Sequence, residues 1–116
     1  MNQFKVCFHV SKLEDWPVAL KNINNFINDI SDESEFDIKV VANSAGVLIL
    51  TNELRSELEP TMKKLSDKGV IFEFCNNALN LYKIDKKLVF DWAKVVKAGI
   101  TEIVRLQELG FSYIKP

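Results

Sequence analysis

The sequence predicts an α/β fold in which helices cover both faces of a mainly parallel sheet. Short apolar segments rich in β-branched and aromatic residues alternate with amphipathic segments that have the three- and four-residue spacing of helices. No two-residue hairpin turn joins neighbouring strand-like segments. Strands that alternate with helices are linked by crossovers, which place them parallel in one sheet. Residues 1–116 are expected to form a single domain, since the length is typical and no linker interrupts it.

The first third of the chain predicts two strands around one helix. Residues 4–10 (FKVCFHV) are apolar on both sides, as expected inside a parallel sheet. A helix is predicted from Asp15, a capping carboxylate, with Pro17 in its first turn. The second strand is predicted at residues 37–42 (DIKVVA), with a turn at residues 43–46 (NSAG).

The segment after this turn is less regular. Residues 47–50 are too few to assign by periodicity, and both a helical turn and a strand extension remain open. Residues 54–58 predict a short helical turn, and Pro60 predicts the start of a separate helix. Gly69 is expected to follow the end of that helix.

The second half repeats the alternation. The third strand is predicted at residues 70–74 (VIFEF), followed by a short helix at 76–82. A short fourth strand is predicted at 93–97, the last helix at 100–110 and a terminal strand at 111–114.

The composition narrows the class of function. The chain has 15 Lys plus Arg, 16 Asp plus Glu and a net charge of −1, which argues against a nucleic-acid-binding surface. Only Arg55 and Arg105 could make forked contacts with a phosphate or carboxylate. The N-terminus lacks the features of a secretory signal, and no apolar segment approaches the length of a membrane span. We therefore expect a cytoplasmic protein without membrane partners.

Cys75 is the main candidate for chemistry, because it stands between the third strand and the helix that follows. A thiol at this junction lies near unpaired N–H groups and the positive end of a helix dipole, which favour a thiolate. The alternative is that Cys75 is a small buried apolar residue, as most free cysteines are. Cys7 lies in the middle of a strand and is expected to be inert packing.

The carboxyl ends of parallel strands gather at one edge of a sheet, where ligands of α/β proteins bind. The residues predicted at this edge, besides Gly99, are His9, Asn43, Ser44, Cys75, Asn76 and Asn77. His9, the only histidine, could share the proton of the Cys75 thiol, as in activated cysteine nucleophiles. A purely structural role for His9 is the alternative. Because the strand order is open, His9 and Asn43 could also lie too far from Cys75 to contact it.

Other familiar signals are absent from the sequence. It contains no GxGxxG turn, no phosphate-binding P-loop, no CxxC pair and no metal-ligand spacing, and nothing in it marks a pair of carboxylates. No cofactor and no metal are therefore expected.

The chain resembles the DsrE/DsrF-like family over nearly its whole length. The resemblance is carried by "FHVS", by "GVIFEFCNNAL" and, most specifically, by the closing "VVKAGITEIVRLQELGFSYIKP". It implies a three-layer α/β/α fold with a five-stranded, mainly parallel sheet, and assembly into trimers or hexamers. Some members take part in intracellular sulfur relays, in which a cysteine accepts sulfane sulfur as a persulfide. The matching position in this sequence is Cys75.

These observations predict a sulfur carrier, similar to a sulfurtransferase, that exchanges sulfur with donor and acceptor proteins through Cys75. The alternatives are a non-catalytic oligomeric protein that binds a small ligand and a structural subunit that needs a catalytic paralogue. Large apolar residues near the C-terminus, Phe90, Trp92, Phe111 and Tyr113, also suggest a homo-oligomer, although they could complete the core of the monomer instead.

Overall fold

The protein is described from a computed structural model, which covers residues 3–30 and 32–116. Its centre is a five-stranded sheet with the order β4-β3-β2-β1-β5, and every neighbouring pair is parallel. The strands are β1 (Gln3–Val10), β2 (Glu35–Ala42), β3 (Ile71–Cys75), β4 (Lys94–Val96) and β5 (Ser112–Ile114). The predicted fold class is confirmed, and all five predicted strands are present.

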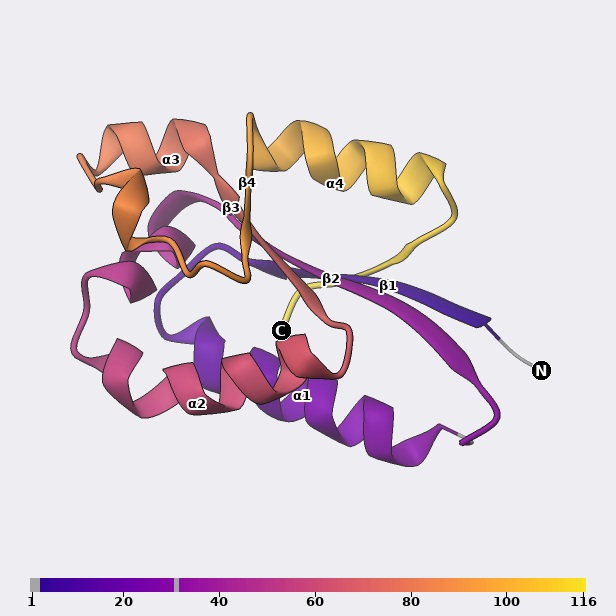
Figure 1. The fold of residues 1–116 in the computed structure, drawn as a ribbon. Helices are drawn as coiled ribbons and strands as arrows, with labels where there is room; N and C mark the ends of the chain where they lie inside the picture. Colours follow the sequence, from indigo (N-terminus) through magenta and orange to yellow (C-terminus); the bar gives the residue numbers. More distant parts are fainter. Residues whose placement is uncertain (1–2, 31) are drawn as a thin grey trace.

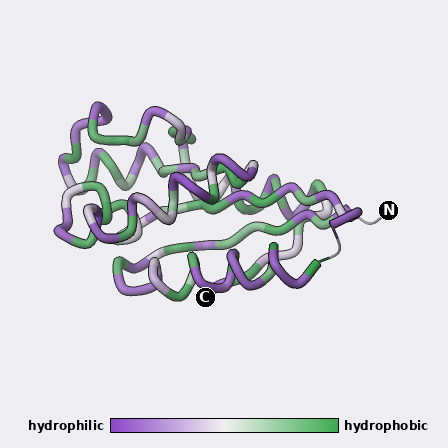
Figure 2. Tube along the Cα trace, turned by 60° about the horizontal axis from the view of Figure 1, so that its bottom comes forward, coloured by the Kyte–Doolittle hydropathy of each residue, from purple (hydrophilic) through white to green (hydrophobic). Residues whose placement is uncertain are grey.

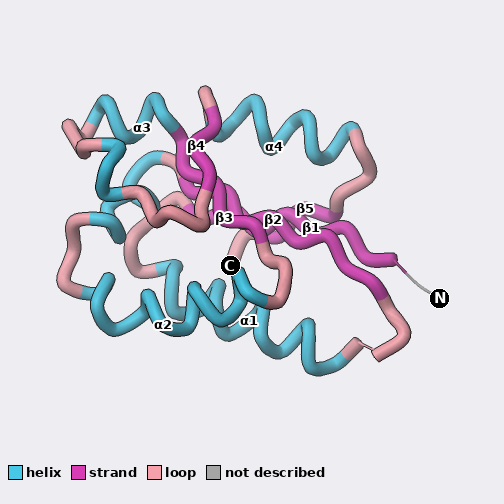
Figure 3. The backbone as a smooth tube through the Cα atoms, in the orientation of Figure 1, coloured by secondary structure: helices cyan, strands magenta, loops and turns pink. Residues whose placement is uncertain are grey.

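Helices cover both faces of this sheet and complete three layers (Figures 1 and 3). α1 (Asp15–Asp29) and α2 (Leu54–Asp67) lie on one face. α3 (Asn76–Leu81) and α4 (Gly99–Glu108) lie on the other. Two 3-10 helices, η1 (Ser44–Leu50) and η2 (Lys86–Leu88), lie in the connections. Residues 47–50, which the sequence left unassigned, are therefore part of a tight helix.

The α1/α2 face of the sheet holds the larger apolar core. Trp16 of α1 is fully buried, and its ring centroid lies 6.2 Å from the rings of both Phe72 and Phe74 on β3. Its indole Nε1 donates a hydrogen bond of 2.8 Å to the carbonyl of Gly46, which satisfies the one polar atom that Trp buries. Figure 2 shows the alternation of hydrophobic and hydrophilic residues along the helices that close this core.

The layer under α4 buries fewer apolar side chains, whereas Ala78 and Leu79 of α3 belong to the larger core. The core cluster under α4 consists of Cys7, Val41, Ile103, Leu106 and Phe111. Successive strand residues point to opposite faces, so each strand supplies both cores.

Two local predictions at helix ends are wrong. α2 is one continuous helix from Leu54, with Pro60 in its interior, instead of a short turn followed by a new helix. Pro60 is exposed, so the backbone carbonyl that it leaves without a donor can bond water, while Met62 and Leu65 of the same helix are buried. α1 begins after Glu14, and no side chain caps it, so Asp15 lies in the first turn and is not the cap.

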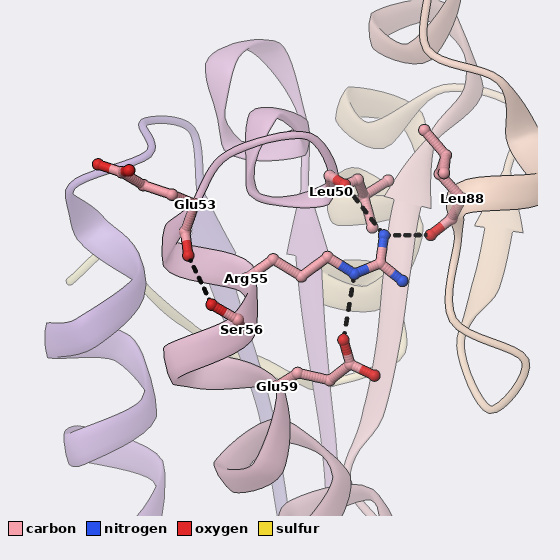
Figure 4. A network of polar contacts seen from close by, with 6 residues as sticks. All are labelled: Leu50, Glu53, Arg55, Ser56, Glu59 and Leu88. Atoms are coloured by element: carbon pink, nitrogen blue, oxygen red, sulfur yellow. Dashed lines mark hydrogen bonds and ion pairs between the residues drawn. The ribbon is translucent and has the colours of Figure 1, made fainter.

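Arg55 joins three segments near the carboxyl edge of the sheet (Figure 4). One guanidinium nitrogen donates to the carbonyls of Leu50 and Leu88, and Nε donates to Glu59. The guanidinium also lies 4.5 Å above the ring of Phe90. Arg55 therefore stabilises the connection between η1, α2 and η2 and is engaged within the monomer.

The aromatic residues near the C-terminus pack mostly within the chain. Phe90 and Phe111 are buried, and Trp92 stacks on Phe90 with 4.5 Å between ring centroids. Tyr113 is 40% exposed. Within the part of the chain that the structure describes, no helix has the length and apolar character needed to cross a membrane.

Candidate functional site

The carboxyl ends of the parallel strands meet at one edge of the sheet, where α3 and α4 begin. β2 runs into Asn43 and Ser44, β3 ends at Cys75, and the chain after β4 enters α4 at Gly99. A cavity of about 220 Å³ opens between these segments. It is lined by Asn43, Ser44, Cys75, Asn77, Ala78, Leu81, Ala98, Gly99 and Ile100. None of these residues carries a charge; below, this space is called the Cys75 cavity.

Cys75 lies against the beginning of α4. A Cβ atom placed on Gly99 would lie 3.3 Å from the Cβ of Cys75 and 2.8 Å from the Cβ of Asn43. A glycine is required at this position, because a larger residue would push α4 away from the strand ends. Cys75 is 6% exposed, so its thiol is sheltered but lies on the cavity wall.

Two helices begin beside this thiol, but they contribute unequally. α3 follows Cys75 directly and has only 6 residues, so its dipole is weak. α4 has 10 residues, and Gly99 and Ile100 of its first turn line the Cys75 cavity. The first N–H groups of a helix have no partner within the helix. The start of α4 therefore favours a negative charge in the cavity.

His9 reaches the site through Asn43. β2 separates β1 from β3, so His9 lies two strands away from Cys75. The His9 ring makes two hydrogen bonds, from Nε2 to Oδ1 of Asn43 at 2.7 Å and between Nδ1 and the Tyr113 hydroxyl at 2.6 Å. Burial lowers the pKa of His9, although the hydrogen bond to Asn43 opposes this effect. The imidazole is thus neutral at neutral pH and holds Asn43 in place.

The other residues that the sequence placed at this edge divide between two environments. Ser44 and Asn77 line the Cys75 cavity. Ser44 has φ of 46°, a left-handed backbone conformation that is uncommon for a residue with a side chain and that concentrates at functional sites. Asn76 does not line the cavity, and its Oδ1 is buried without a hydrogen-bond partner among the described residues.

Cys7 occupies a different environment from Cys75. It is fully buried under α4, within the cluster that contains Ile103 and Leu106. Burial, together with smaller contributions from the nearby carboxyls of Glu73 and Glu102, raises the pKa of the Cys7 thiol to about 12. Cys7 is therefore a protonated packing residue at physiological pH.

The structure also brings together a pair of carboxyls that the sequence did not mark. Glu73 of β3 is 5% exposed and Glu102 of α4 is 6% exposed. Burial and the adjacent Glu102 raise the pKa of Glu73 to about 8, against the opposing charges of Lys39 and Arg105. Burial alone would raise the pKa of Glu102, but hydrogen bonds with Glu73 and Arg105 outweigh it and lower that pKa. The pair therefore shares one proton near neutral pH.

A sequence signal for half of this pair was present. Glu73 interrupts an otherwise apolar strand, which is unusual for a central position of a parallel sheet. Glu102 gave no comparable signal, because acidic residues are common in the first turn of a helix. Arg105 donates two N–H groups to Glu102, so both arginines of the chain are engaged in internal contacts.

A larger groove of about 520 Å³ lies on the opposite layer, between α1 and α2. Its walls include the lysines Lys21, Lys64 and Lys68, but no cysteine, histidine or carboxylate. It therefore offers no thiol for sulfur chemistry, and the smaller Cys75 cavity is the better candidate. Among the residues that the structure describes, no group of three or more His, Cys, Asp or Glu side chains could hold a metal ion.

The chain is thus a small α/β protein with a five-stranded parallel sheet and a cysteine at the carboxyl end of an inner strand. The chain belongs to the DsrE/DsrF-like family, whose model matches residues 8–116. It is also similar to the solved structure of MTH1491, a protein of unknown function from Methanobacterium thermoautotrophicum. The TM-score is 0.85 at 30% sequence identity, and the match covers 97% of this chain and 99% of that chain. No functionally curated protein matches the sequence. Family membership associates the chain with functions related to sulfur relay.

Proposed function

We propose that the protein is a sulfur carrier in which Cys75 accepts sulfane sulfur and passes it on. The Cys75 thiolate attacks the outer sulfur of a donor persulfide, the S–S bond of the donor breaks, and the donor leaves as a thiolate. Cys75 then carries the outer sulfur and its proton as a persulfide. An acceptor thiolate repeats the attack on that outer sulfur and releases Cys75 as a thiolate. Each step is an exchange without net oxidation, so no cofactor is needed.

The observation that carries this proposal is the placement of Cys75 on the wall of a small uncharged cavity at the beginning of α4. Cys75 itself is only 6% exposed, and the α4 N–H groups favour an anionic sulfur without a basic side chain. Cys7 cannot take this role, because it is fully buried and holds its proton to a pKa of about 12.

The mouth of the cavity supports protein partners as donor and acceptor. Leu81 and Ile100 both line the cavity and are 71% and 62% exposed, respectively. Exposed apolar side chains around a sheltered nucleophile are suited to transient contact with another protein. A homo-oligomer, trimer or hexamer, remains part of the proposal on the family resemblance.

The alternative, a non-catalytic protein that binds a small ligand in the same cavity, has one specific observation in its favour. Asn43, Ser44 and Asn77 provide neutral polar groups at the wall, which could bind a small uncharged molecule as well as a sulfur anion. A purely structural subunit would instead leave Cys75 without any sulfur.

Intact mass after incubation with glutathione persulfide separates these functions. The wild-type protein is expected to gain the mass of one sulfur atom, which a reductant removes. Cys75→Ser should not gain it, and the matched variant Cys7→Ser should gain it fully. A protein that gains no sulfur, or that gains it equally in Cys75→Ser, would contradict the carrier function.

A further inference from the structure

Two hydrogen bonds fix both the tautomer of His9 and the orientation of Asn43. An amide oxygen can only accept, so the contact of 2.7 Å with Asn43 Oδ1 requires a proton on Nε2 of His9. In a neutral imidazole the other nitrogen then accepts, so the Tyr113 hydroxyl donates a hydrogen bond of 2.6 Å to Nδ1. The order of donation is therefore Tyr113 to His9 to Asn43.

This order leaves the amide nitrogen of Asn43 as an unused donor. It makes no hydrogen bond with any residue in the described parts of the chain. Because the oxygen is turned to His9, the nitrogen points away from that ring. Asn43 lines the Cys75 cavity, and a Cβ on Gly99 would touch both Asn43 and Cys75. The unused N–H groups and the sulfur therefore border the same small space.

We propose that the amide N–H groups of Asn43 bind the anionic sulfur on Cys75, and that His9 and Tyr113 are positioning residues that hold the amide in this orientation. The bound group is the Cys75 thiolate before sulfur transfer and the outer sulfur afterwards; only the second part rests on the proposed function. A hydrogen bond to an anion is stronger than one between neutral groups. Asn43 thus provides, within an uncharged cavity, part of the stabilisation that a cation provides elsewhere.

The test uses the reactivity of Cys75 towards iodoacetamide across a pH range, measured in the full-length Cys7→Ser protein. Asn43→Ala is expected to move the midpoint of the rate profile upward by about one pH unit and to slow alkylation at neutral pH about tenfold. Asn43→Asp should move it further, because a carboxylate repels the thiolate. Asn80→Ala, on the exposed side of α3 and outside the cavity, is the matched control and should leave the profile unchanged.

Two further variants test the positioning role without changing a residue of the cavity. His9→Phe keeps an aromatic ring but removes both nitrogens, so the amide is free to rotate. We expect an upward shift in the same direction as in Asn43→Ala. Tyr113→Phe removes only the hydroxyl that sets the His9 tautomer and should give a smaller shift of the same sign. A general loss of folding would instead lower thermal stability and expose Cys75, which speeds alkylation.

The outcomes distinguish this proposal from the carrier function. If Asn43→Ala and His9→Phe give the same profile as their parent, the role of Asn43 is wrong, even if Cys75 still gains sulfur. If the profiles shift as expected and no persulfide forms, the thiolate contact stands and the carrier function fails. If Asn43→Ala does not fold, Asn43→Asp and Tyr113→Phe test the role of Asn43 in its place. Alkylation profiles that are unshifted in both variants would overturn the proposal.

Discussion

The two faces of the sheet carry out different tasks. On the α1/α2 face, Trp16, Phe72 and Phe74 are fully buried in one large apolar core. Under α4 on the other face, the apolar cluster is small, and buried Glu73 and Glu102 lie within the same layer. The first face provides most of the burial that stabilises the fold, and the second holds the polar and titratable groups.

Alternation along single strands produces this division. On β3, residues 72 and 74 enter the apolar core, while residues 73 and 75 face α4. The same alternation gives the two cysteines different surroundings on the same face: Cys7 lies under the middle of α4, and Cys75 lies beside its first residue. Position along α4, rather than burial alone, separates a packing thiol from a candidate nucleophile.

The largest expected effect is the difference in reactivity between the two thiols. At a given pH, a pKa of about 12 leaves Cys7 with about a thousandfold less thiolate than a thiol with the ordinary value of 9.0. With iodoacetamide, Cys7→Ser, which retains Cys75, should label more than about a hundredfold faster than Cys75→Ser. In urea the two rates should converge, because unfolding removes the difference in burial. Equal alkylation rates of Cys7 and Cys75 in the folded protein would contradict the predicted difference in reactivity between the two thiols.

The next effect concerns the stability provided by each face. Trp16→Ala should lower the free energy of unfolding by about 3–5 kcal/mol, because it leaves a large cavity against Phe72 and Phe74. Ile103→Val, in the smaller cluster under α4, should cost about 1 kcal/mol. Urea titration measures both. A loss in Ile103→Val as large as that in Trp16→Ala would show that the α4 layer is equally important for stability.

The smallest effect is a pH dependence on the polar face. The pKa of Glu73, raised from 4.5 to about 8, means that the folded state binds this proton more tightly than the unfolded state. Its stabilisation is therefore complete below about pH 4.5 and is lost as the pH rises through about 8. Glu73→Gln cannot ionise, so its stability relative to wild type should increase between pH 5 and pH 9. Three pH units at about 1.4 kcal/mol each set an upper limit of about 4 kcal/mol, and solvent screening reduces this to on the order of 2 kcal/mol.

Urea titrations of wild type and Glu73→Gln across this range measure the difference. The groups that face Glu73 are Glu102, Arg105, Lys39 and Cys7, and all remain in the variant. Glu108 is exposed at the end of α4, the helix that carries Glu102. Glu108→Gln is therefore the matched control, and its stability relative to wild type should not change with pH. A difference between Glu73→Gln and wild type that stays constant with pH would show that the two carboxyls do not share a proton.

The sequence alone determined the fold class and the candidate nucleophile. The apolar residues in 70–74 and the apolar stripe on α1 are local patterns of the sequence. Both segments form the predicted strand and helix, because their apolar side chains face the core. The position of Cys75 at the end of β3 followed from the same local pattern. The continuity of α2 through Pro60 could not be predicted in this way. Burial of Met62 and Leu65 against the sheet outweighs the tendency of proline to interrupt a helix.

Only the tertiary structure decided which residues meet at the site. The strand order β4-β3-β2-β1-β5 places β2 between His9 and Cys75, so the histidine contacts Asn43 rather than the thiol. The closeness of Gly99 to Cys75, and of Glu102 to Glu73, depends on where α4 crosses the sheet. Such contacts join residues that are far apart in the chain. They are determined by how whole helices and strands pack together, and no local sequence pattern predicts that packing.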